Sequence, residues 1–226
     1  MNNPYIHDLN IQRIYSIIHN LNKVNDINYI LDLGCRDGSE AIQFSCAFPN
    51  AKIISVEANP NQIETIKSNI KNYSNIQIFN FGVSNKEEEL DFNISSTINI
   101  GNSSFLKITG DYDDHEKMSF HTPIKVKTKR LDNFLKELQI PQVDILWMDI
   151  QGFEGKAIEG LGDYIKNVKI LHSEVAYKEM YKDQLLFDKF DFCMLENGFH
   201  CIYRDYKHGD FWGDSIYLNS QKCIIQ

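Results

Sequence analysis

Cysteine is scarce and irregularly placed in this chain of 226 residues. The five cysteines include no C-x-x-C pair, and their odd number leaves one over: Cys35, Cys46, Cys193, Cys201 and Cys223. A disulfide framework needs paired cysteines, and a structural zinc site usually needs closely spaced ones. We therefore expect ordinary thiols in a reducing compartment, which favours a cytoplasmic protein.

Long apolar stretches and dominant basic tracts are also missing. No run approaches the roughly 18 consecutive apolar residues typical of a membrane-spanning helix, and no basic region followed by a continuous apolar stretch opens the chain. The formal net charge of −8 offers no general attraction for nucleic acid or an anionic membrane. We expect a soluble protein without nucleic-acid partners or membrane insertion. No pattern indicates an oligomeric state.

With 42% hydrophobic residues and no repeat or linker, the chain has the composition of one α/β domain. We predict an N-terminal helical segment at 1–28 and a domain at 29–226. About 25 polar residues interrupt that domain at 95–122, and such a long loop is typically functional, so we interpret it as a lid. Within it, residues 101–105 could lie over a ligand. Residues 111–117 look solvated, and His115 and His121 are more typical of exposed histidines than of bases.

The most informative stretch is ILDLGCRDGSEAIQFSCAFPNAKIISVEANPN, at 30–61. It predicts a strand at 29–33, a turn with Gly34 and Gly38, a helix at 39–48, and a second strand at 52–57 that ends in Glu57. Glycine lets a ligand approach the turn, where the helix also directs unpaired N–H groups. An acid at the tip of the next strand can accept both hydroxyls of a ribose. The pattern predicts a nucleoside pocket.

The turn favours S-adenosylmethionine over a dinucleotide as the ligand. A dinucleotide turn has three glycines, whereas GCRDG offers two, at Gly34 and Gly38. Asp32 and Asp37 would repel a pyrophosphate but suit an ammonium or a sulfonium group. NAD and an unrelated α/β turn stay open as alternatives. The expected cofactor contacts are Asp32, Gly34, Cys35, Gly38, Glu57, Ala58, Asn80, Gly82 and Asp149, with Asn80 or the Gly82 backbone reaching adenine.

Periodicity predicts the remaining elements. Further strands are expected at 76–81, 143–148, 168–175, 199–204 and 215–218, with a short antiparallel strand near 90–94 and another at 123–128. Helices are expected at 8–24, after Asn59, after Leu131, before Leu161 and at 183–196. The run at 143–148 is apolar apart from Asp144 and is therefore predicted to be buried on both faces.

Two acids end neighbouring predicted strands. Asp149 follows the buried strand at 143–148, and Glu174 lies near the end of the next strand. The two could share Mg²⁺ or Mn²⁺, with His172 on the same face as a third ligand or as the base. Equally, Asp149 could hold only the amino group of the cofactor, and Glu154 could only cap its helix. The catalytic candidates are Asp149 and His172, and the metal candidates are Asp149 and Glu174.

Several segments together resemble the FkbM family of S-adenosylmethionine-dependent methyltransferases. They are DLGCRDG (32–38), VEANP (56–60), FNFGVSN (79–85), MDIQGFEGKAIEGL (148–161), ILHSEV (170–175) and NGF (197–199). The resemblance implies a doubly wound, Rossmann-like sheet of seven strands, mostly parallel with an antiparallel last strand, as in Class I methyltransferases. It also implies methyl transfer to an oxygen, often a hydroxyl of a sugar or natural product. The turn residues Cys35, Arg36 and Asp37 depart from the usual family pattern.

The acceptor is the least defined partner. Tyr203, Tyr206, Phe211 and Trp212, with His208 and Asp210, could form a wall that stacks on a sugar, or they could be ordinary packing. We expect a small-molecule or glycan substrate. A nicotinamide-dependent oxidoreductase and a non-catalytic scaffold that binds S-adenosylmethionine are the alternative functions.

Overall fold

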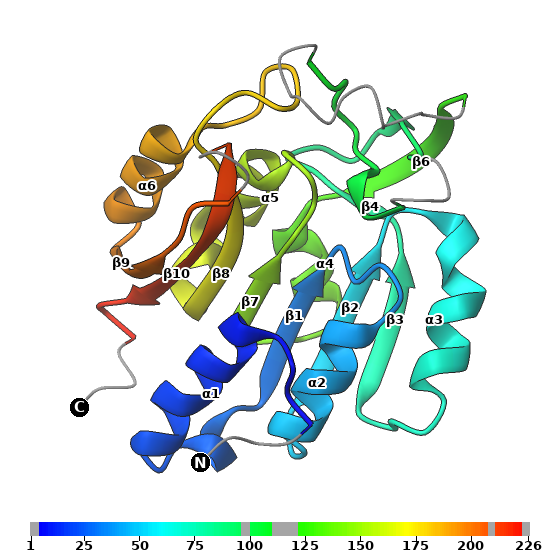
Figure 1. The fold of residues 1–226 in the computed structure, drawn as a ribbon. Coiled ribbons are helices and arrows are strands. Elements are labelled where there is room, and N and C mark those ends of the chain that lie inside the picture. The colour runs from blue at the N-terminus through cyan, green and yellow to red at the C-terminus, as the bar shows by residue number, and fades with distance from the viewer. Residues whose placement is uncertain (1–4, 96–99, 110–121, 208–210, 223–226) are drawn as a thin grey trace.

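The structure is a computed structural model that describes residues 5–95, 100–109, 122–207 and 211–222 (Figure 1). Some residues considered above lie outside these ranges, namely the segment 111–117 with His115, then His121, His208, Asp210 and Cys223. None of the helices within the described ranges is long and apolar enough to cross a membrane.

A seven-stranded sheet forms the centre of the molecule, in the order β3-β2-β1-β7-β8-β10-β9. The strands are β1 (Tyr29–Leu33), β2 (Lys52–Glu57), β3 (Ile76–Asn80), β7 (Val143–Met148), β8 (Val168–Ala176), β9 (Phe199–Arg204) and β10 (Trp212–Asn219). The pairs from β3 to β8 are parallel, whereas β10 runs antiparallel to both β8 and β9. The predicted mostly parallel sheet with an antiparallel last strand is confirmed.

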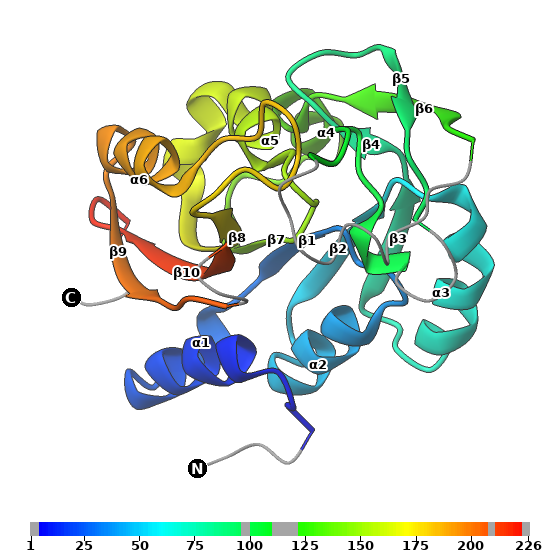
Figure 2. The same ribbon diagram turned by 45° about the horizontal axis from the view of Figure 1, so that its top comes forward.

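Helices cover both faces of this sheet, as Figure 2 shows. One apolar core joins the sheet to α1 (Leu9–Asn20), α2 (Ser39–Ala47) and α3 (Ile63–Ile70). The other core joins it to α4 (Leu131–Glu137), α5 (Glu154–Leu161) and α6 (Phe187–Glu196). Along β1, Ile30 belongs to the first core while Leu31 and Leu33 belong to the second. Every residue of β7 is buried, including its one acid, Asp144, which accepts from Asn28 N and Tyr29 N and pairs with Lys169.

The strand order reverses between β1 and β7. In a doubly wound sheet the crevice outside the carboxyl ends of the strands at such a reversal is where ligands bind. At this point Asp149 N donates to Leu33 O at 3.1 Å, and Gly34 N donates to Val56 O at 2.9 Å. Hydrogen bonds therefore hold the turn after β1 to the carboxyl ends of β2 and β7.

A small sheet lies beside this edge, in the order β4-β6-β5. It consists of β4 (Gly82–Val83), β5 (Glu89–Phe92) and β6 (Ile124–Lys129), and β5 pairs antiparallel with β6. Phe92, Ile94 and Val126 form its own apolar cluster, against which Ala58 and Phe105 pack. This sheet places aromatic side chains next to the carboxyl ends of the main strands. Within the described residues, short 3₁₀ helices span Val24–Asp26, Pro60–Gln62, Ile100–Asn102 and Gly162–Asn167.

The predicted bounds of two helices were wrong. The helix expected at 8–24 begins after the capping residue Asp8 and ends at Asn20, because Asn22 has a positive φ of 56°. The helix expected at 183–196 begins only at Phe187, because Asp183 has a φ of 64° and turns the chain. The strand expected at 215–218 is longer and starts at Trp212, where it pairs with the end of β8.

Candidate active site

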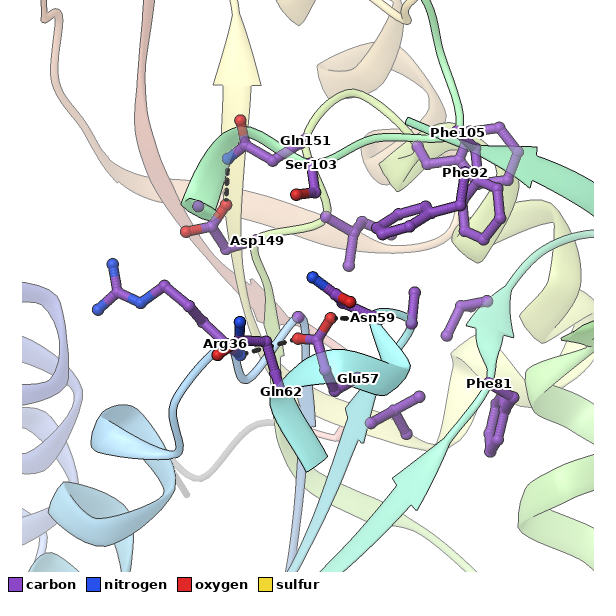
Figure 3. Close-up of a pocket in the computed structure, with 17 residues that line it drawn as sticks. Arg36, Glu57, Asn59, Gln62, Phe81, Phe92, Ser103, Phe105, Asp149 and Gln151 are labelled. Atoms are coloured by element: carbon purple, nitrogen blue, oxygen red, sulfur yellow. Dashed lines mark hydrogen bonds between the residues drawn. The ribbon is translucent and has the colours of Figure 1, made fainter. Parts of the chain in front are cut away.

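A pocket opens at the carboxyl ends of β1, β2 and β7 (Figure 3). Its lining combines an acidic side with an apolar, largely aromatic side. The lining residues are Gly34, Arg36, Val56, Glu57, Ala58, Asn59, Gln62, Phe81, Val83, Phe92, Gly101, Ser103, Phe105, Asp149, Ile150, Gln151 and Phe153. Of the predicted cofactor contacts, the structure brings Gly34, Glu57, Ala58 and Asp149 together here.

Gly34 is required by the geometry of the turn. Its φ is +83°, and a Cβ atom at this position would lie 1.9 Å from the main-chain oxygen of Asp149. An L side chain is strained at such a φ, and no movement of a flexible side chain would relieve a collision with backbone. The glycine therefore allows the turn after β1 to lie directly against the end of β7.

Glu57 is fixed by main-chain donors. Its Oε2 accepts from Arg36 N at 2.9 Å, and its Oε1 accepts from Asn59 N at 2.7 Å. The side chain is only 7% exposed. Burial raises the pKa of Glu57 to about 7, although the main-chain donors favour the charged form. Both oxygens keep further lone pairs that can accept hydroxyl protons from the pocket.

Asp32 and Cys35 do not line the pocket. Asp32 is fully buried beneath the turn, where Ser55 Oγ donates to its Oδ2 at 3.0 Å. Desolvation by burial raises the pKa of Asp32 well above its usual value. Cys35 is also fully buried and packs in the core that contains α2. The structure places both residues as supports of the turn.

Gly38, Asn80 and Gly82 also lie outside the lining. Gly38 caps α2 with a φ of +86°. Asn80 Nδ2 donates to Glu57 O at 2.8 Å, so its amide holds the main chain beside Glu57. A Cβ atom on Gly82 would lie 2.2 Å from the ring of Phe105. The space next to Gly82 is therefore filled by an aromatic ring from the segment 100–109.

The side chain of Gln151, for which the sequence predicted no role, bridges Asp149 and Glu174. Gln151 Nε2 donates to Asp149 Oδ1 at 2.7 Å and to Glu174 Oε2 at 3.1 Å. Desolvation raises the pKa of Glu174 well above its usual value, and the negative charge of Asp149 raises it further. Solvent reaches Asp149 from the pocket mouth, yet desolvation by the surrounding protein raises the pKa of that carboxyl as well.

Glu154 is the first residue of α5 and bonds back to the turn that precedes the helix. Its Oε1 accepts from Ile150 N at 3.0 Å, and its side chain is buried with 7% exposure. Burial raises the pKa of Glu154 to about 7. This hydrogen bond closes the turn before α5, and the capping interpretation is wrong, because the N-cap is Phe153 and no side chain caps this helix.

His172 is placed away from the pocket lining. Its ring stacks on Trp147 with the centroids 3.5 Å apart, and only 2% of the residue is exposed. Its Nε2 lies 3.4 Å from Asp214 Oδ1. Burial pushes the pKa of Asp214 upward, but His172 and Lys207 together hold that pKa below its usual range. His172 thus contacts a second buried acid and not the pocket.

A three-ligand metal site is not assembled by the residues that the structure describes. Among them, no group of three or more His, Cys, Asp or Glu side chains is arranged to hold a metal ion. His172 contacts Asp214, and the amide of Gln151 bridges the predicted metal pair, Asp149 and Glu174. The described donors therefore do not fit the three-ligand arrangement that includes His172.

The aromatic residues near the end of the chain do not form one wall on this pocket. Tyr206 is 52% exposed and stacks on Tyr177, with ring centroids 4.4 Å apart. Tyr203 lies under the Arg13 guanidinium, 3.9 Å from its ring centroid. The four rings Tyr203, Tyr206, Phe211 and Trp212 are all absent from the pocket lining.

Arg36, Gln151 and Tyr181 are the site residues that sequence reasoning missed. Arg36 lines the pocket as a half-exposed cation, with its Nη2 3.8 Å from Glu40 Oε1. Tyr181 Oη donates to Gln151 Oε1 at 2.8 Å. The signal for Arg36 was its departure from the family pattern in the turn. For the Tyr181 contact there was no signal, since 30 residues separate the two side chains.

Comparisons with known proteins assign the chain to a family. A family model described as the Methyltransferase FkbM domain matches residues 32–201. The 2-O-methyltransferase NoeI of Sinorhizobium fredii is 28% identical over 163 residues, a match that spans 69% of this chain and 66% of NoeI. The chain thus matches slightly less than two thirds of that relative.

Solved structures share the fold at low sequence identity. A putative caffeoyl-CoA O-methyltransferase from Staphylococcus aureus has a TM-score of 0.52 at 11% identity, covering 96% of this chain and 86% of its own. The N-terminal domain of EvdMO1, crystallised in the presence of SAH and D-fucose, has a TM-score of 0.52 at 8% identity, covering 94% and 83%. Because the family model spans well over half of the 226 residues, the chain belongs to the FkbM family of S-adenosylmethionine-dependent methyltransferases.

Proposed function

We propose that this enzyme transfers the methyl group of S-adenosylmethionine to a hydroxyl of a sugar, glycan or natural-product acceptor, with Asp149 as the base. The observation that carries the proposal is the position of two acids in one pocket. Glu57 lies at the tip of β2 and Asp149 follows β7, on either side of the glycine turn. Glu57 suits the ribose of the cofactor, and Asp149 suits the end of the pocket where the methyl group would be transferred.

The lining residues fit the parts of this cofactor. Glu57 would accept the ribose hydroxyls, and the rings of Phe81, Phe92 and Phe105 offer apolar surface for adenine. Arg36, the cation among the lining residues, would pair with the carboxylate of the methionine part. When bound, the cofactor supplies a methyl group attached to a positively charged sulfur.

Asp149 would orient the acceptor and take its proton. The bound cofactor would supply the methyl carbon: a lone pair of the acceptor oxygen would form the new C–O bond, and sulfur would keep the electron pair of the broken C–S bond. The hydroxyl proton passes to the Asp149 carboxylate and from there to solvent, which reaches this side chain. The Asp149 carboxylate on the pocket lining would also attract the positively charged sulfonium group of the bound cofactor.

The oxygen acceptor is supported by the relative and by the chemistry of the site. The matched relative is named as a 2-O-methyltransferase. A hydroxyl needs a base near the reacting oxygen, and Asp149 is an acid on the pocket lining with access to solvent. A neutral, hydroxyl-rich acceptor such as a glycoside also avoids repulsion by the acids here.

The test is methyl transfer from radiolabelled S-adenosylmethionine to a panel of neutral glycosides, compared between the wild type and Asp149→Asn. General base catalysis contributes about 10²–10⁴-fold, so we expect the variant to lose at least about 100-fold in kcat. Its affinity for S-adenosylhomocysteine should change by less than about threefold. Wild-type turnover by Asp149→Asn would place the base elsewhere.

The same assay tests whether methyl transfer requires a divalent cation. Treatment with EDTA, followed by Mg²⁺ or Mn²⁺, should leave the rate unchanged if the bridge through Gln151 holds the two acids during turnover. A rate that falls with EDTA and returns with either cation would instead assign Asp149 and Glu174 as metal ligands.

A further inference from the structure

The amide of Gln151 occupies the space between two acids. Its Nε2 lies 2.7 Å from Asp149 Oδ1 and 3.1 Å from Glu174 Oε2. A primary amide nitrogen carries two hydrogens, so both can be donated at once. Figure 3 shows the contact to Asp149 at the pocket edge, while the second oxygen of Asp149 carries no dashed bond to the residues drawn.

Tyr181 determines which way this amide faces. If the amide were rotated by half a turn, its oxygen would face two carboxylates and the interaction would be repulsive. The hydroxyl of Tyr181 donates to Gln151 Oε1 at 2.8 Å, on the side opposite the acids. The residue is only 2% exposed. A buried donor at the amide oxygen therefore selects the orientation in which both hydrogens reach the acids.

Gln151 and Tyr181 also contact the segment 100–109, which borders the pocket. Ser104 Oγ donates to Gln151 O at 2.7 Å, and Tyr181 Oη also lies 3.3 Å from Asn102 O. Ile108 pairs with Tyr181 as an antiparallel bridge. Gly101, Ser103 and Phe105 of this segment line the pocket. Gln151 and Tyr181 thus connect the two acids, Asp149 and Glu174, to part of the pocket wall.

The backbone conformation at Gln151 is unusual for a residue other than glycine. Its φ is +53°, in the left-handed region that few residues other than glycine adopt. Such a conformation is unfavourable and persists where surrounding contacts fix it. Here the contacts are the bonds to Asp149, Glu174, Tyr181 and Ser104.

We propose that Gln151, oriented by Tyr181, is a positioning residue for methyl transfer. It holds Asp149 by one carboxylate oxygen, so that the other oxygen faces the acceptor, and it keeps Glu174 from repelling Asp149. Through Tyr181 this arrangement depends on the segment 100–109 being seated over the pocket. The inference rests on the proposed function, because it concerns the same acid.

The first experiment requires no acceptor. In heteronuclear NMR spectra of the full chain, the side-chain amide pair of Gln151 is assigned as the pair missing from Gln151→Ala. Both of its proton resonances should lie downfield of exposed glutamines, because both are bonded to carboxylates. In Tyr181→Phe they should move toward the positions of exposed glutamines. Ordinary glutamine shifts in the wild type, or unchanged shifts in Tyr181→Phe, would overturn the proposal.

Tyr164→Phe is the matched control for the loss of one hydroxyl. Tyr164 Oη donates to Ile140 O at 2.9 Å and does not line the pocket. This variant should leave the Gln151 amide resonances where they are in the wild type. If Tyr164→Phe shifts them as much as Tyr181→Phe, the shift reports general loosening, and the assignment of Tyr181 fails.

A double-mutant cycle gives the kinetic test on an acceptor found with the panel of glycosides. Gln151→Ala and Tyr181→Phe should each lower kcat at least about tenfold, with the KM for S-adenosylmethionine within about threefold. Adding Tyr181→Phe to Gln151→Ala should cost less than about twofold more, because Tyr181 acts through the amide. Independent, multiplicative losses would overturn the proposal.

The two proposals fail in different ways. If the protein does not bind S-adenosylhomocysteine, the proposed function fails whatever the amide resonances show. If binding and transfer occur while the Gln151 variants keep the wild-type kcat, only the positioning role fails.

Discussion

The two ends of the pocket hold their acids by different means. At the ribose end, Glu57 is bonded to the main-chain N–H groups of Arg36 and Asn59, which flank it in the folded turn. At the reaction end, Asp149 and Glu174 are bonded to the side chain of Gln151, which is oriented by Tyr181. Main-chain donors follow from the fold itself, whereas the second arrangement depends on particular side chains. Most substitutions should therefore spare the ribose end and disturb the reaction end.

The largest effect is expected where the turn of the ribose end meets the end of β7. Gly34→Ala would force a Cβ atom within 1.9 Å of Asp149 O at a φ of +83°. We expect a loss of at least about 3 kcal/mol in the free energy of unfolding, measured by urea denaturation. Such a loss would disturb both ends together.

Gly38→Ala is the control for that substitution. Its φ of +86° is equally strained, but the nearest atoms to a new Cβ are side-chain carbons of Ile70 and Ile66, at 3.1 and 3.4 Å. We expect a loss of only about 1 kcal/mol, since side chains can shift. Equal losses in the two variants would contradict the assigned contact with Asp149.

Glu154→Gln should reduce the pH dependence of the free energy of unfolding without changing a residue that lines the pocket. Burial raises the pKa of Glu154 to about 7, above its ordinary value of 4.5, so the folded state holds a proton that the unfolded state releases between these pH values. Stability is therefore lost as the pH rises through this window. Glutamine can still accept from Ile150 N without ionising.

We expect the wild type to lose stability between pH 5 and pH 8, and Glu154→Gln to lose roughly 1–3 kcal/mol less over the same interval. Urea denaturation at both pH values measures this. Glu64→Gln is the control, because Glu64 lies on the surface with its side chain 85% exposed. An unchanged pH dependence in Glu154→Gln would show that this acid is ionised throughout.

The smallest effect concerns the exposed cation between the two ends. Arg36→Gln should weaken binding of S-adenosylhomocysteine about fivefold, or about 1 kcal/mol, because the guanidinium is half exposed and solvent screens it. Binding of 5′-methylthioadenosine, which has no amino-acid carboxylate, should stay within about twofold. Equal weakening of both ligands would remove the assignment of Arg36 to the carboxylate.

The sequence predicted the ribose end well because that end is local. The strands at 29–33 and 52–57 have the predicted bounds, and Glu57 lies on the pocket as its position at a strand tip indicated. Family membership then favours methyl transfer over the nicotinamide and scaffold alternatives. Even here Asp32 and Cys35 were assigned to the ligand, although the turn buries them.

The reaction end was predicted only in part, because distant segments complete it. Alternation placed His172 on the face of Glu174, but could not show that Trp147 covers the ring. Likewise, Phe105 fills the space beside Gly82 from a segment with no regular pattern. The left-handed φ of Gln151 and its contact with Tyr181 depend on tertiary structure, which periodicity does not encode.

The most direct measurement of the central claim is calorimetric titration of the wild type and Glu57→Ala with S-adenosylhomocysteine, with NAD⁺ as the control ligand. A hydrogen bond to a charged group contributes about 1.5–3 kcal/mol, so the variant should bind at least about tenfold more weakly, while NAD⁺ should bind neither protein. Circular dichroism would confirm that the variant is folded. Equal affinity of a folded Glu57→Ala for S-adenosylhomocysteine would contradict the assignment of this pocket.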